Sequence, residues 1–153
     1  MSEQQPVFTI EKIYLKDLSL EIPNAPQVFT EREPPKIDIS LHNEVKAIDN
    51  GIYEVVLTAT VTAKHNDKTA FLVEVAQAGI FQARDLPPQD LDAVMNVVCP
   101  NNLLPYARET VSTVLSRAGF PAVILPHVGF EAIYQQWLQE QQEQLQAGTP
   151  PAA

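Results

Sequence analysis

The chain has 153 residues and a formal net charge of −9, which describes one acidic domain large enough to bury a hydrophobic core. Its single cysteine excludes an internal disulfide framework and an all-cysteine zinc site, and it fits a reducing compartment. An acidic surface repels nucleic-acid phosphates, so we expect no nucleic-acid partner.

The ends of the chain carry no targeting pattern. Residues 1–6 contain neither a basic segment nor an apolar one, so we expect no secretory signal. No apolar run approaches the roughly 18 residues of a membrane span, so we expect a cytoplasmic protein without direct membrane insertion. We predict a flexible N-terminus over residues 1–6, one folded domain over residues 7–145 and a disordered tail over residues 146–153.

The first predicted strand runs from Val7 to Glu21. Apolar and polar residues alternate along it, as on a strand with one buried face. The alternation changes phase near Ile13, which predicts a bulge. Beyond the bulge, Asp17 and Glu21 fall on the polar face.

A long connection over residues 22–35 follows this strand. Its four prolines prevent regular strand pairing. Because the connection also carries Val28 and Phe29, we expect a packed crossover loop rather than a disordered segment.

Three further strands are predicted, over residues 37–42, 53–63 and 69–78. The dipeptide Asn50-Gly51 is a strong turn signal between the first two of them. Neighbouring strands joined by short turns predict a four-stranded antiparallel sheet with one apolar and one polar face. The apolar face of the last strand takes Val73 and Val75, and its polar face takes Leu72 and Glu74.

Helical periodicity replaces strand alternation near the motif at residues 98–109. We predict a helix over residues 103–118, with Asn102 as its N-cap, Pro105 in its first turn and Gly119 at its end. Its apolar stripe is wider than one small sheet can cover, which favours burial of this helix between subunits.

A second long helix is predicted after an extended segment that ends near Val128. It is amphipathic, and its apolar positions recur at helical spacing. These positions are Phe130, Ile133, Tyr134, Trp137, Leu138 and Leu145.

Patterns that carry catalysis are missing from the sequence. There is no phosphate loop, no dinucleotide fingerprint and no nucleophile elbow, and the three histidines lack the spacing of metal ligands. Cys99 lies among apolar residues, so we interpret it as a packing residue rather than a nucleophile. We therefore expect no enzyme, no cofactor and no metal site.

Six motifs follow one another along the chain, at residues 13–21, 23–26, 53–57, 69–75, 79–81 and 99–109. In this order they resemble the SecB family of protein-export chaperones, and the resemblance extends over about residues 8–142. It implies an α+β fold in which helices pack on one face of a four-stranded antiparallel sheet with a long crossover loop.

The resemblance also implies a homotetramer that is built as a dimer of dimers. In the family, the positions of Val73, Val75 and Gln77 influence tetramer assembly. Together with Val111 and Leu115 of the wide helix stripe, they form the oligomer interface that we expect.

The implied function is to hold unfolded preproteins in an export-competent state and to deliver them to the translocation ATPase SecA. The family's client groove lies between the crossover loop and the last helix. Here that groove corresponds to Val28, Phe29, Ile133, Tyr134, Trp137 and Leu138.

The resemblance places a second binding surface on the polar face of the sheet. In the family this face docks the basic, zinc-bearing tail of SecA, so the zinc belongs to the partner. The matching positions are Asp17, Glu21, Leu72 and Glu74.

Two alternatives stay open at this point. One is a SecB-like chaperone of a toxin-antitoxin system, although the intact acidic patch favours export. The other is a small enzyme or ligand-binding protein that uses the same grooves.

Overall fold

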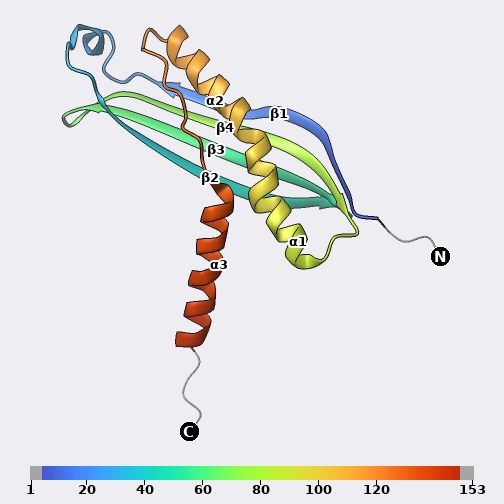
Figure 1. Ribbon diagram of the computed structural model, residues 1–153. Coiled ribbons are helices and arrows are strands. Elements are labelled where there is room, and N and C mark those ends of the chain that lie inside the picture. The colour runs from blue at the N-terminus through green and yellow to red at the C-terminus, as the bar shows by residue number, and fades with distance from the viewer. Residues whose placement is uncertain (1–4, 149–153) are drawn as a thin grey trace.

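A computed structural model describes residues 5–148. The predicted flexible N-terminus and disordered tail fall largely outside this range, and residues 146 and 147 belong to the last helix. The core of the fold is an antiparallel sheet in the order β1-β4-β3-β2 (Figure 1). Its strands are β1 (Val7–Glu21), β2 (Lys36–Asp49), β3 (Ile52–His65) and β4 (Lys68–Arg84).

Helices follow the sheet in the chain, apart from one short turn in the crossover loop. The long helix α2 lies across one face of the sheet, and α3 projects away from it (Figure 1). The helical elements are η1 (Gln27–Thr30), α1 (Pro88–Ala93), the π-helical turn η2 (Val94–Val98), α2 (Cys99–Arg117) and α3 (Phe130–Ala147). The predicted α+β architecture is therefore confirmed.

Strand alternation explains the two faces of the sheet. Along β3, Val55, Leu57, Ala59 and Val61 are fully buried, while the residues between them are partly exposed. Since successive side chains of a strand point to opposite faces, one face of the sheet is apolar and packs under α2, and the other faces solvent.

Both hairpin turns use residues that tolerate a left-handed backbone. Gly51 has φ 72° between β2 and β3, and Asn66 has φ 55° between β3 and β4. The Asn50-Gly51 turn is thus confirmed. Strand β1 is irregular at two points, between Ile10 and Lys12 and between Leu15 and Asp17, on either side of the predicted bulge.

The predicted start of the long helix is wrong. Asn102 is not an N-cap: it lies inside α2, where its Nδ2 donates to Val98 O at 2.8 Å, and Pro105 also lies inside the helix. Helical backbone begins at Pro88 and continues through η2, where the N–H of Cys99 donates to Val94 O, five residues back. The wider π turn precedes Pro100, which has no N–H to donate, so the chain enters α2 without a break.

The predicted end of this helix is confirmed. Gly119 has φ 93°, its N–H donates to Ser116 O at 3.2 Å, and the N–H of Phe120 donates to Leu115 O at 3.0 Å. These two bonds form a Schellman motif, in which glycine accepts the left-handed conformation without steric cost. Among residues 5–148, no helix is both long and apolar enough to cross a membrane.

Candidate functional site

An open groove lies between the edge strand β2 and helix α3. Its volume is about 510 Å³, and nearly all of its wall is apolar. Apolar grooves of this size are typical binding sites for ligands and peptide segments. Its lining consists of Ile39, Leu41, Asn43, Leu57, Asn96, Pro126, Val128, Phe130, Ile133, Tyr134 and Trp137.

The groove exposes large apolar side chains to solvent. Ile133 is 57% exposed, Trp137 is 46% exposed and Ile39 is 37% exposed. The Tyr134 and Trp137 rings stack with their centroids 6.1 Å apart, so they form one continuous aromatic surface. A cluster of this kind indicates a surface that is covered when a partner binds.

Helix α3 is tied to the rest of the chain by a hydrogen bond beside the groove. The hydroxyl of Tyr134 donates to Asp92 Oδ2 at 2.5 Å, and the amide of Asn96 in turn donates to Asp92 O at 2.8 Å. The hydrogen bond to Asp92 raises the pKa of Tyr134 to about 12. This contact links α3 to α1 beside the groove.

The crossover loop does not reach this groove. Phe29 packs on Phe120, with ring centroids 5.1 Å apart, and Phe120 packs on Phe71 at 4.8 Å. Val28 is buried and lines a separate hollow of about 270 Å³. The structure therefore brings Ile133, Tyr134 and Trp137 together, but it keeps Val28 and Phe29 apart from them.

The groove residues that sequence reasoning missed lie on β2. Ile39 and Leu41 line the groove because they point to the apolar face of the sheet beyond the reach of α2. Their alternation with polar residues was the available signal. Leu138, which sequence reasoning assigned to the groove, is half-buried on α3 and does not line it.

The predicted acidic patch is brought together on the solvent-facing side of the sheet. Glu21 pairs directly with Leu72, and Ser19 pairs with Glu74, so these side chains share one face of β1 and β4. Asp17, one step further along, lies on the same face, and all three carboxylates are exposed. Leu72 lies among these carboxylates and is half-buried, so it offers a small apolar contact between charged groups.

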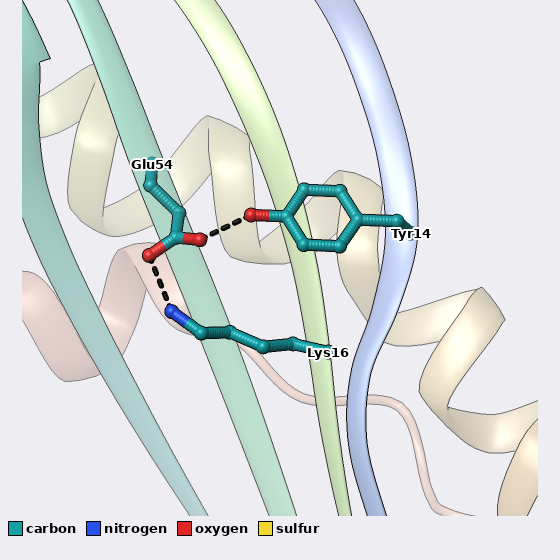
Figure 2. Close-up of polar contacts among 3 residues, drawn as sticks. All are labelled: Tyr14, Lys16 and Glu54. Carbon is teal, nitrogen blue, oxygen red and sulfur yellow. Dashed lines mark hydrogen bonds and ion pairs between the residues drawn. The ribbon is translucent and has the colours of Figure 1, made fainter.

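A cluster of three polar side chains lies at one end of this patch. Tyr14 and Lys16 extend from β1 across β4 to Glu54 on β3 (Figure 2). Lys16 Nζ lies 2.7 Å from Glu54 Oε1, and the Tyr14 hydroxyl donates to the other carboxylate oxygen. No local pattern could indicate this long-range contact, because its members are about 40 positions apart.

These contacts change the protonation equilibria of the cluster. The Lys16 ammonium and the Tyr14 hydroxyl hold the pKa of Glu54 below its usual value. Burial and the bond to Glu54 raise the pKa of Tyr14 to about 12. Because Lys16 is paired with Glu54, its positive charge is offset by that carboxylate at the boundary of the patch.

The expected oligomer interface is already covered within one chain. Val73, Val75, Val111 and Leu115 are fully buried, because α2 packs its apolar stripe onto β3 and β4. Gln77 is 4% exposed, and its Nε2 donates to Tyr14 O at 3.1 Å. The burial of these residues within one chain does not test the predicted contact between subunits, which stays a prediction.

The structure also describes the surroundings of Cys99 and of the side chains that could bind a metal ion. Cys99 is fully buried, and burial raises the pKa of its thiol to about 12, which suits packing rather than nucleophilic attack. Among residues 5–148, no group of three or more His, Cys, Asp or Glu side chains is arranged to hold a metal ion.

Comparisons with known proteins identify close relatives of the chain. A family model described as preprotein translocase subunit SecB matches residues 1–141. The protein-export protein SecB of Methylobacillus flagellatus is 60% identical over 139 residues, which cover 91% of this chain and 88% of the relative. The protein of the same name from Chromobacterium violaceum is 58% identical over 151 residues, which cover 97% and 99%.

One solved structure shares the fold at much lower sequence identity. It is a SecB-like chaperone of Mycobacterium tuberculosis in complex with a peptide from the HigA1 antitoxin. It aligns with a TM-score of 0.65 and 18% identity, and the alignment covers 79% of this chain and 90% of that one. This likeness supports the sheet-and-helix architecture alone.

Proposed function

The chain belongs to the SecB family and is a chaperone of protein export, and from this premise we propose that it holds unfolded preproteins in the groove between β2 and α3 and delivers them to the translocation ATPase SecA. Export is favoured over a toxin-antitoxin role, because curated relatives named for protein export are 53–60% identical whereas the antitoxin-bound chaperone is 18% identical.

The observation that carries the groove assignment is its exposed apolar wall beside a free strand edge. Since β2 is the last strand of the sheet that residues 5–148 form, its outer backbone groups have no neighbouring strand from that range. An extended polypeptide can therefore pack apolar side chains against Ile133 and Trp137 while its backbone lies along β2. Neither kind of contact reads a specific sequence, as a holder of many preproteins requires.

Two exposed side chains on α3 allow a direct test of the groove. We expect the double substitution Ile133→Ser and Trp137→Ser to weaken binding of a reduced, unfolded polypeptide by about a hundredfold, because it removes much of the apolar wall. Isothermal titration calorimetry measures the change. Ile124→Ser is the matched control, since Ile124 is 64% exposed but does not line the groove. Equal affinities for the wild type and the double variant would contradict the groove assignment.

Delivery requires a second surface, and the acidic patch meets that need. A docking partner with a basic segment and one apolar side chain would match Asp17, Glu21 and Glu74 around Leu72. The basic tail of SecA, which the family resemblance implies as the partner, would supply the positive charge. Client and SecA would then bind on opposite faces of one sheet, so that both can be held at once.

We also propose that the protein works as a dimer of dimers. The support lies on the free edge strand β1, which exposes apolar side chains on the face that α2 does not cover fully. Phe8, Ile10, Leu15 and Leu18 are between 37% and 44% exposed. An exposed apolar edge strand is a ready surface for pairing with a second copy, so β1 is one contact that we expect between subunits, in addition to the predicted contact through α2.

A further inference from the structure

One polar side chain in the groove has an unsatisfied atom. Asn43 of β2 lies where the groove meets a second hollow of about 360 Å³. Its Nδ2 donates to Met95 O at 3.2 Å, but its Oδ1 is buried and has no hydrogen-bond partner among residues 5–148. Buried acceptors without a partner are rare in native proteins and call for a physical explanation.

The orientation of this amide follows from the π turn. Within η2 the backbone bonds span five residues, as from the Cys99 N–H to Val94 O. The next bond in that series would come from residue 100, but Pro100 has no N–H to donate to Met95 O. Asn43 supplies it with Nδ2, and its oxygen must therefore face the other way.

Oδ1 of Asn43 can only accept hydrogen bonds, so any ligand for it must be a donor. The surrounding groove wall is apolar and contributes few polar groups. A polypeptide brings one backbone N–H with every residue except proline, and the extended backbone of a chain lying along β2 would present such donors to Asn43.

We propose that Asn43 is the polar anchor of the client groove and that its Oδ1 accepts a hydrogen bond from a backbone N–H of a bound, extended preprotein segment. This role rests on the proposed function of the groove. Because Oδ1 is covered in the structure, the donor reaches it when the groove opens at this end, where the Tyr134–Asp92 bond holds α3. A backbone contact orients the client without selecting its sequence.

The test is a double-mutant cycle that combines substitution of Asn43 with methylation of the peptide backbone. One ligand is a proline-free peptide rich in leucine and phenylalanine, and the other is the same peptide methylated at every backbone nitrogen, which keeps the side chains and removes all N–H donors. Calorimetry gives the loss of affinity on methylation for the wild type and for Asn43→Leu. We expect the loss to be about fivefold smaller in the variant, as for one net hydrogen bond.

Control variants distinguish loss of the Asn43 hydrogen bond from misfolding and from loss of the apolar groove wall. Asn102→Leu removes a similar amide-to-carbonyl bond outside the groove and should keep the loss seen in the wild type. Asn43→Ala repeats the measurement with a smaller side chain, and circular dichroism checks that both variants fold. An equal loss in the wild type and in the Asn43 variants would overturn the anchor alone. If Ile133→Ser with Trp137→Ser also bound the peptide normally, both the groove and the anchor would fail.

Discussion

The two proposed binding surfaces lie on opposite faces of the sheet and are held together in different ways. The acidic patch is built from paired residues of neighbouring strands, such as Glu21 and Leu72, whose positions follow from strand register. The groove joins β2 to α3, which are about 90 residues apart in the chain, and the Tyr134–Asp92 bond is a polar contact beside it.

This difference suggests that the two surfaces bind different kinds of partner. A surface fixed by register can hold charges in a constant pattern, which suits one partner with one recognition segment. A groove whose wall is a projecting helix can change its width, which suits unfolded chains of many sequences. Substitutions should therefore affect one surface without affecting the other, and salt should weaken binding at the patch more than in the groove.

Charge reversal in the patch should have the largest effect. We expect Asp17→Lys combined with Glu74→Lys to weaken binding of the zinc-loaded SecA tail by about a hundredfold, because two attractive contacts become repulsive. Binding of an unfolded polypeptide in the groove should not change. Titration of both ligands at the same ionic strength measures the separation.

The control for this prediction keeps the change in net charge. Glu31→Lys combined with Glu143→Lys reverses two exposed carboxylates outside the patch. This variant should bind the SecA tail within about twofold of the wild type. If the patch variant kept full affinity for the tail, or if the control lost as much affinity, the assignment of the patch would be wrong.

The sequence was informative where structure depends on local alternation. The faces of Leu72 and Val73, the Asn50-Gly51 turn and the end of the long helix at Gly119 all follow from neighbouring residues, and all were predicted correctly. The start of that helix was not, because an asparagine with a proline three residues later fits an N-cap and first turn, and the π turn that carries the helix past Pro100 leaves no local pattern.

The groove could be predicted only in part, because its shape depends on where distant segments dock. Helical spacing identified Ile133 and Trp137, but it could not show that α3 lies beside β2 while Phe29 packs against Phe120. The width of the α2 stripe predicts burial between subunits. Within one chain β3 and β4 already cover Val111 and Leu115, so the contact between subunits stays a prediction.

A smaller effect is expected at the boundary of the patch. The substitution Glu54→Gln should lower the free energy of unfolding by about 1 kcal/mol at neutral pH, because Lys16 and Tyr14 lose a charged partner whose side chain is only 13% exposed. The pKa of Glu54 is lowered in the folded state, so this contribution is complete above the ordinary carboxyl value of 4.5 and is lost as pH falls through the lowered pKa. Urea unfolding at neutral and acidic pH measures it, and a difference between wild type and variant that did not shrink in acid would contradict the assignment.

The smallest expected effect tests the hydrogen bond between Tyr134 of α3 and Asp92 of α1. Trp137 is the only tryptophan of the chain, and its ring stacks on Tyr134, so its fluorescence reports the ionisation of that tyrosine. The pKa of Tyr134 is raised to about 12, so the stabilisation of α3 by Asp92 is present below the ordinary value of 10.0 and is lost as pH rises through 12. We expect Asp92→Asn to move the alkaline fluorescence transition from about 12 toward 10.0, with Asp90→Asn, which lies on α1 without a bond to Tyr134, as control. A transition unchanged in Asp92→Asn would mean that Asp92 does not bind the Tyr134 hydroxyl in solution, and the groove would then differ from the acidic patch even more, because this polar contact beside its wall would be missing.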